Sequence, residues 1–168
     1  IPKVPLDTLD FTSAAMELGS KMIMDATKKT REKKKQKSKH FDVRPLDKRI
    51  LDSAIMEETL LIVKVRNRGR QVIEKLIAHP SLQGYSMIAA VSEDVNIHDR
   101  ENCIWGIFTR FDCERDILIT QPELLGISQV YHGVMGIDAT LKHGYPEPLV
   151  MDPSIVHRVD QQWEEYWR

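Results

Sequence analysis

The stretch "EETLLIVKVRNRGRQVIEKLIAHPSLQGYSMIAAVSED", residues 57–94, holds two apolar runs on either side of one amphipathic segment. The first run, residues 57–66, is too continuously apolar for a surface strand and predicts a strand covered on both faces. Residues 70–80 carry apolar side chains at helical spacing and stop at a proline, which predicts a helix. Residues 85–94 predict a second buried strand. This order is typical of parallel strands joined by a crossover helix.

A second amphipathic helix is predicted over residues 99–111, "DRENCIWGIFTRF". Asp99 suits the N-cap position, because its carboxylate accepts a hydrogen bond from the first turn. Ile104, Trp105 and Phe108 fall on one side of such a helix, and we expect them to form its buried face.

The remaining elements complete an α/β pattern. Residues 115–120, "RDILIT", predict a third strand, and residues 134–140, "VMGIDAT", predict a short strand at the end of a loop-rich stretch. Residues 152–168 predict a terminal amphipathic helix, with Asp152 at its cap and Pro153 at its first position. The expected fold is a small sheet with crossover helices and a C-terminal amphipathic helix.

The chain divides by composition into two parts. Residues 1–44 predict an extended arm, and residues 45–168 predict the α/β domain. The arm contains a basic linker, residues 28–39, with eight basic side chains against one acidic, whereas the rest of the chain holds 16 basic against 24 acidic. A solvated linker is the usual role of such a run, and docking on an acidic face of a partner subunit is the alternative. No aromatic residue interrupts the run to stack on bases, so we expect no nucleic acid.

The cysteine content and the hydropathy indicate the compartment. Cys103 and Cys113 are the only cysteines, which favours a reduced, cytoplasmic setting over a disulfide framework. No apolar run approaches the roughly 20 residues that span a bilayer, so we expect no membrane segment.

The sequence shows no reactive constellation. Glycine-rich phosphate loops, zinc-spaced cysteines and a nucleophile elbow are all missing from it. Glu93 and Asp94 end a predicted strand, but neighbouring residues of a strand point to opposite faces, so they are not expected to act as a pair. Arg110, Arg115 and Asp116 are interpreted as a charged turn with local ion pairs. We therefore predict no catalytic, cofactor-binding or metal-binding residue.

The C-terminus is unusually aromatic. Trp163, Tyr166 and Trp167 lie within the last six residues. Aromatic anchors are enriched in cores and at the centres of interfaces. Packing on the chain's own domain and docking into a neighbour both remain open.

The stretch "VSEDVNIHDRENCIWGIFTRFDCERDILI", residues 91–119, resembles the C-terminal domain of the UbiD family of (de)carboxylases. "MGIDATLK", residues 135–142, and the terminal helix resemble the closing motif of that domain. The resemblance covers residues 45–168. It implies that prenylated FMN, a divalent metal and potassium are bound by a large N-terminal catalytic domain that this sequence lacks. In the family, a basic residue of the turn before the second strand approaches the flavin phosphate, but "HPSLQGY", residues 79–85, offers no such cation.

The resemblance implies an assembly or cleft-closing subunit of a UbiD-type aromatic-acid (de)carboxylase complex, as in a phenylphosphate-carboxylase-like assembly. Its partners would be a larger UbiD-like catalytic subunit, further copies of this chain, or both. A stand-alone interaction or structural protein derived from such a domain is one alternative. A fragment of a full-length decarboxylase is another.

One phrase of the closing motif occurs twice. "GSKMIMDATKK", residues 19–29, matches "HGVMGIDATLK", residues 132–142, so that Met22 and Asp25 align with Met135 and Asp138. The first phrase is a copy of the closing segment or a chance similarity. If it is a copy, we expect Met22 and Asp25 to contact a partner subunit, together with the C-terminal aromatics.

Overall fold

The computed structural model describes residues 4–5, 18–19, 41–145 and 150–167. Met22, Asp25 and the basic linker at residues 28–39 lie outside these ranges. Two short strands, β1 (Val4–Pro5) and β2 (Leu18–Gly19), pair antiparallel. The division of the chain into an arm at residues 1–44 and a domain at residues 45–168 therefore stays a prediction.

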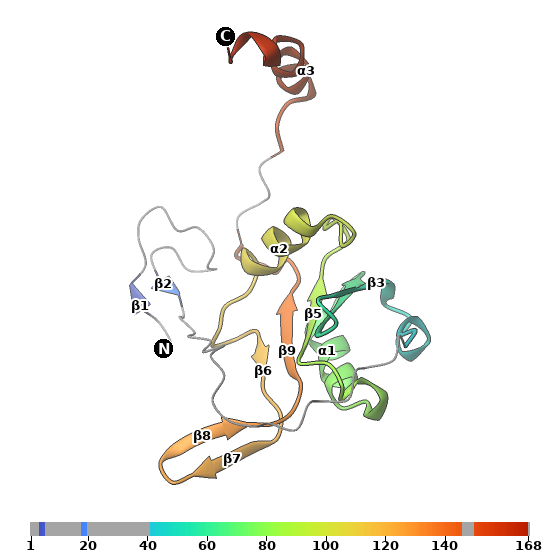
Figure 1. The fold of residues 1–168 in the computed structure, drawn as a ribbon, viewed down its shortest axis with the longest axis vertical. Coiled ribbons are helices and arrows are strands. Elements are labelled where there is room, and N and C mark those ends of the chain that lie inside the picture. Colours follow the sequence, from blue (N-terminus) through green and yellow to red (C-terminus); the bar gives the residue numbers. More distant parts are fainter. Residues whose placement is uncertain (1–3, 6–17, 20–40, 146–149, 168) are drawn as a thin grey trace.

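A five-stranded mixed sheet forms the body of the molecule (Figure 1), with the strand order β3-β4-β5-β9-β6. The three central strands are parallel, and β3 and β6 are antiparallel edge strands. The predicted crossover is confirmed, because α1 joins β4 to β5. The bounds are β3 (Ile50–Met56), β4 (Leu60–Val65), α1 (Gly69–Ile77), β5 (Met87–Val91), α2 (Arg100–Phe108), β6 (Ile117–Leu118) and β9 (Met135–Ala139).

Both faces of the sheet are covered, as the first apolar run predicts. Successive side chains of a strand point to opposite faces. Leu61 and Val63 of β4 therefore pack with the apolar side of α1, while Ile62 packs with α2 and β9. Each fully buried side chain of this kind contributes about 1.5–3 kcal/mol through the hydrophobic effect. Two core layers thus hold the helices against the sheet.

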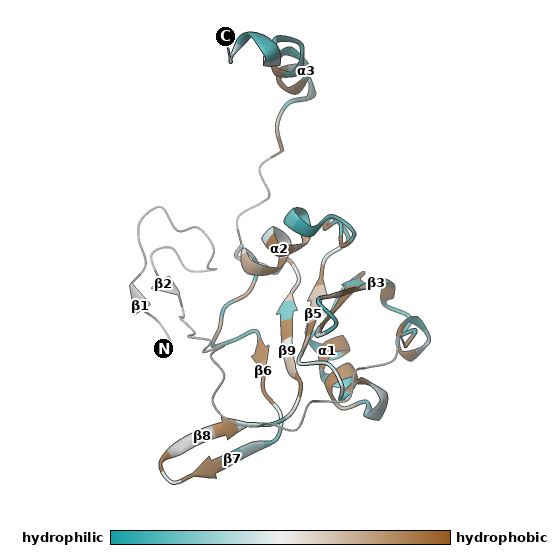
Figure 2. Ribbon diagram, viewed as in Figure 1, coloured by the Kyte–Doolittle hydropathy of each residue, from teal (hydrophilic) through white to brown (hydrophobic). Residues whose placement is uncertain are grey.

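Two hairpins were not predicted. Glu57 and Glu58 adopt positive φ angles of 50° and 56° and form the turn between β3 and β4, so β4 begins later than residue 57. Strands β7 (Pro122–Leu125) and β8 (Ser128–Tyr131) form a second hairpin in the stretch interpreted as loop-rich. Figure 2 shows hydrophobic colouring on this hairpin, which projects from the body.

The predicted buried face of α2 is wrong. Ile104, Trp105 and Phe108 are exposed, Trp105 by 72%, whereas Cys103, Gly106 and Ile107 are buried. A Cβ on Gly106 would meet a methyl group of Val95 at 2.7 Å, so the glycine allows α2 to approach the loop after β5 closely. The helix therefore turns Cys103, Gly106 and Ile107 inward. The predicted N-cap is confirmed, since Asp99 accepts a hydrogen bond from the backbone N–H of Asn102 at 3.0 Å.

The C-terminal helix α3 (Pro153–Gln162) begins as predicted and continues into a short 3₁₀ turn, η3 (Trp163–Glu165). Asp152 accepts a hydrogen bond from the N–H of Ser154 at 2.8 Å. Figure 1 shows α3 standing apart from the sheet and its two covering helices, and none of its residues is buried. Within the described ranges, no helix combines the length and the apolarity that crossing a membrane requires.

Candidate functional site

The carboxyl ends of β4, β5 and β9 meet at one edge of the sheet, which is where open α/β sheets place their ligands. We call this the carboxyl edge and define it by the residues that follow the three strands: 66–68, 92–94 and 140–142. Side chains from the loop between α2 and β6 converge on the same edge. Several residues that carry the UbiD resemblance lie at or beside this edge: Glu93, Asp94, Arg110, Arg115, Asp116 and residues 138–142.

Asp138 and Thr140 form the buried centre of the carboxyl edge. Asp138 Oδ1 accepts hydrogen bonds from the Thr140 N–H at 3.1 Å and from Thr140 Oγ1 at 2.6 Å. Gly69, the first residue of α1, packs so tightly on both that a Cβ there would overlap with them. The pair therefore fixes the start of α1 against the end of β9.

Lys142 connects this centre to the loop between α2 and β6. Its ammonium group donates to the carbonyls of Asp138 at 2.7 Å, Thr140 at 2.9 Å and Arg110 at 3.1 Å. It also lies 3.3 Å from Asp116 Oδ2. Burial lowers the pKa of Lys142, and the charges of Asp138 and Asp116 oppose that shift. All donors of this ammonium group are thus directed at groups of the chain itself.

Asp116 is the buried anion of the network. Its carboxylate accepts two hydrogen bonds from Arg115, at 2.8 and 2.9 Å, and one from the Asp112 N–H at 2.9 Å. Burial acts to raise the pKa of Asp116, but these hydrogen bonds and the charge of Lys142 outweigh it and hold the pKa below its usual range. Tyr145 closes the network, since its hydroxyl accepts from Arg115 at 2.7 Å. The predicted local pairing of Arg115 with Asp116 is confirmed.

Arg110 pairs across the edge rather than locally. Its guanidinium donates to both oxygens of Asp94, at 2.8 and 2.6 Å, and these hydrogen bonds lower the pKa of Asp94. Glu93 instead lies 3.8 Å from Arg66. The two neighbouring carboxylates therefore have different partners, in agreement with their predicted divergence.

The geometry of the carboxyl edge is that of a structural support. The charges of Asp116 and Lys142 are buried and paired, and the hydrogen bonds of Lys142 and Asp138 are all made to groups of the chain itself. Such networks specify a fold when every member is satisfied. Within the part of the chain that the structure describes, no group of three or more His, Cys, Asp or Glu side chains could hold a metal ion.

The predicted interface residues of the C-terminus are exposed. Trp163, Tyr166 and Trp167 expose 52%, 57% and 73% of their surface, and the two indole rings touch edge to face with centroids 5.7 Å apart. Packing of these residues into the sheet's own core, one of the two open alternatives, is not observed. Met22 and Asp25 lie outside the described residues.

A further apolar surface was missed by the sequence analysis. Leu124, Leu125 and Ile127, which we call the hairpin tip, are exposed at the end of β7 and in the turn to β8. Gly126, with a φ of 65°, makes that turn. A two-residue turn that begins with glycine, as Gly126–Ile127 does, is a hairpin signal that could have been recognised.

The chain matches a known protein family over most of the sheet. The family described as "3-octaprenyl-4-hydroxybenzoate carboxy-lyase C-terminal domain" matches residues 48–139, which is more than half of the chain. The chain therefore belongs to this family, the UbiD C-terminal domain. An uncharacterized protein of Archaeoglobus fulgidus is 31% identical over 123 residues, and one of Aeropyrum pernix is 28% identical over 124 residues. The match covers 63% and 64% of this chain but only 26% of either relative, so the chain spans about a quarter of their length.

Solved structures share the fold. The closed form of vanillic acid decarboxylase from Sedimentibacter hydroxybenzoicus aligns with a TM-score of 0.54 at 16% identity, covering 75% of this chain and 30% of that one. The UbiD-class enzyme HmfF from Pelotomaculum thermopropionicum, solved in complex with FMN, aligns with a TM-score of 0.51 at 20% identity, covering 68% and 29%. The small sheet with its crossover helices is thus a UbiD-class C-terminal fold.

The turn before β5 does not fit a flavin phosphate. Gln83 donates from its side-chain amide to the carbonyls of Ile77, at 2.8 Å, and His79, at 3.2 Å. Leu82 and Tyr85 are buried in the core. The turn closes on itself and offers no cation, so no step of flavin chemistry is assigned to these residues.

Proposed function

We propose that this chain is the assembly and cleft-closing part of a UbiD-type aromatic-acid (de)carboxylase, with the catalytic domain on another chain. That domain would hold prenylated FMN with a divalent metal and potassium. The chain itself would contribute surfaces rather than reacting groups.

The observation that carries this proposal is the placement of large apolar side chains on two projecting elements. The hairpin tip and the aromatic residues of α3 and η3 are exposed, while the core of the sheet is complete without them. Exposed apolar surface of this extent on a small domain marks contact with another protein.

Native mass spectrometry of the protein purified from its source tests the proposal. We expect a complex that contains a larger UbiD-like chain and a bound flavin. If the protein runs alone, with no such chain and no flavin absorbance, the proposal fails and a stand-alone interaction protein takes its place. If the same polypeptide continues into a catalytic domain, the chain is a fragment of a full-length enzyme.

Surface variants locate the contact. Replacing Trp163 and Trp167 by Ser should release the larger chain from a tagged protein, because aromatic anchors dominate interface energies. Replacing the exposed Val150 and Met151, outside α3, by Ser is the matched control and should leave the complex intact. The isolated chain should not turn over aromatic acids even with added prenylated FMN, and measurable turnover would contradict the assignment of chemistry to a partner.

A further inference from the structure

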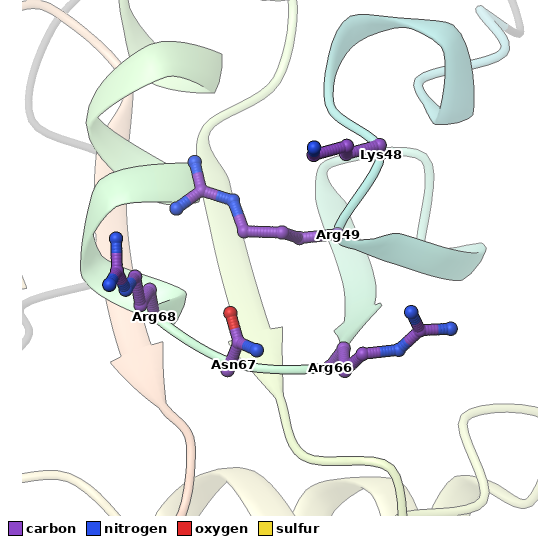
Figure 3. Close-up of a pocket in the computed structure, with 5 residues that line it drawn as sticks. All are labelled: Lys48, Arg49, Arg66, Asn67 and Arg68. Carbon is purple, nitrogen blue, oxygen red and sulfur yellow. The ribbon is translucent and has the colours of Figure 1, made fainter.

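A pocket of about 420 Å³ lies beside the start of α1 and is lined by Lys48, Arg49, Arg66, Asn67 and Arg68. We call it the basic pocket; Figure 3 shows its five lining side chains. Its volume falls within the range of about 300–1,000 Å³ that is usual for small-molecule sites. Four of its five lining residues are cationic, although the chain as a whole has a net charge of −1.

The backbone around the basic pocket is held by two sets of hydrogen bonds. The Arg66 N–H donates to the carbonyl of Arg49 at 3.0 Å, which joins the end of β4 to the residue before β3. Arg68 adopts a left-handed conformation with a φ of 52°, and its carbonyl accepts from Gln71 and Val72 in the first turn of α1. Both walls of the pocket are therefore fixed by main-chain contacts.

One cation of the pocket is already neutralised. Arg49 donates to both oxygens of Asp47, at 2.9 and 2.7 Å, and to Gln71 Oε1 at 2.7 Å. These contacts hold its guanidinium across the pocket toward α1, as Figure 3 shows. Arg49 thus acts as a fixed wall of hydrogen-bond donors rather than as free charge.

The other cations leave an excess of positive charge. Arg66 points away from Arg68 in Figure 3 and lies 3.8 Å from Glu93, where both side chains are exposed. Among the described residues, no hydrogen bond or ion pair engages the side chains of Lys48 and Arg68. The first turn of α1 contains no acidic residue and no side-chain cap. The buried Asp138 carboxylate packs against Gly69 at this helix end and offsets the helix dipole, so the charge of the pocket comes from its side chains.

We infer that the basic pocket binds a small phosphate-bearing anion. Lys48 and Arg68 supply the uncompensated charge, and the amide of Asn67, the residue before Arg68, supplies a neutral donor. Several cations around one pocket suit a dianion with three or four acceptor oxygens better than a single carboxylate. This site is independent of the proposed assembly role, because it uses neither the hairpin tip nor α3.

Titration with phosphate, followed by two-dimensional ¹H–¹⁵N NMR, tests the inference. Inorganic phosphate and glycerol phosphate are added separately at an ionic strength kept constant with sodium chloride. We expect saturable shifts of the backbone amides of residues 66–70 with at least one of the two. Tighter binding of glycerol phosphate would indicate an organic ester as the natural ligand, and tighter binding of inorganic phosphate would indicate the free ion.

Three variants separate a specific site from general charge attraction. Arg68→Asn keeps a residue type that tolerates the left-handed conformation, and Lys48→Gln changes an exposed side chain; each should weaken binding at least tenfold. Arg158→Gln removes the same charge from the exposed surface of α3 and should leave the affinity unchanged. The inference would be overturned by chemical shifts that change linearly without saturation, or by equal losses of affinity in all three variants. Stronger binding of a polyglutamate peptide than of either phosphate would also overturn it.

Discussion

Replacing Lys142 by Met is the sharpest test of the carboxyl edge as a structural support. The ammonium group satisfies three main-chain carbonyls and lies beside the buried carboxylate of Asp116. Methionine retains the apolar stem but none of these contacts. If the network holds the loop between α2 and β6 against β9, its loss should appear directly in the free energy of unfolding.

The size of the effect follows from the contacts of Lys142. Removing one partner of a buried ion pair costs about 3–5 kcal/mol. The low end applies, because the Lys142 side chain is 19% exposed and Arg115 still pairs with Asp116. We therefore expect a loss of about 3 kcal/mol, against a total stability of about 5–15 kcal/mol for such domains. This corresponds to a fall in Tm of about 6–12 °C for a chain of this size.

Urea unfolding of both proteins at pH 7, followed by circular dichroism, measures the difference. Lys75→Met is the matched control, since Lys75 is half exposed and lies 3.6 Å from Asp47; surface changes of this kind stay within about 0.5 kcal/mol. A Lys142→Met variant no less stable than the Lys75→Met variant would refute the structural role of the network.

Three further predictions concern Asp116, Tyr85 and the two sides of α2. Asp116→Asn should cost about 2–4 kcal/mol at pH 7. Because the folded-state pKa of Asp116 is lowered, its contribution is present above the unfolded pKa of about 3.9 and is lost as the pH falls through the folded pKa. Urea titrations at pH 7 and pH 3 should therefore show a smaller difference from the wild type at pH 3. Tyr85→Phe should leave stability unchanged or raise it by up to about 1 kcal/mol, because no described group pairs with the buried Tyr85 hydroxyl; a clear loss in thermal unfolding would reveal a partner for it. Trp105→Lys should change stability by less than about 0.5 kcal/mol, whereas Ile107→Ala should cost about 2–4 kcal/mol. A larger loss for Trp105→Lys than for Ile107→Ala in urea unfolding would show that Trp105 lies on the buried face of α2, as the sequence predicts.

The central fold could be predicted because its signals are local and agree with one another. The apolar run of β4, the helical spacing of α1 and the run of β5 each specify one element, and together they predict a parallel strand pair joined by a crossover helix. The caps Asp99 and Asp152 were also predictable, since an N-cap needs only its own first turn.

The orientation of α2 could not be predicted from periodicity. Its sequence places large apolar residues on one side and Cys103, Gly106 and Ile107 on another, and hydrophobicity favours the larger side. The structure buries the smaller side because Gly106 allows contact with Val95, a tertiary effect that involves a neighbouring loop. Because that side of α2 is buried, Trp105 on the other side is exposed, which the sequence did not predict.

The polar network was equally hidden from the sequence. Arg110, Asp116, Asp138 and Lys142 appear as separate charged positions, and their convergence depends on β9 lying between β5 and β6. That strand order brings the end of the chain's last strand beside a loop more than twenty residues earlier. From the sequence, Arg110 and Asp116 were interpreted as parts of a charged turn with local ion pairs, and Asp138 and Lys142 only as parts of a family pattern.

These contacts also bear on the repeated phrase. In the second copy, Asp138 and Thr140 pack against Gly69, and Lys142 pairs with Asp116. Asp25, Thr27 and Lys29 repeat the same residues at the same spacing, and a strand with this motif would need an equivalent glycine and an equivalent buried carboxylate. In this sheet β9 already fills the position between β5 and β6. If the first copy is functional, it requires another sheet of the same kind, and the proposed assembly with a second UbiD-like domain would supply one.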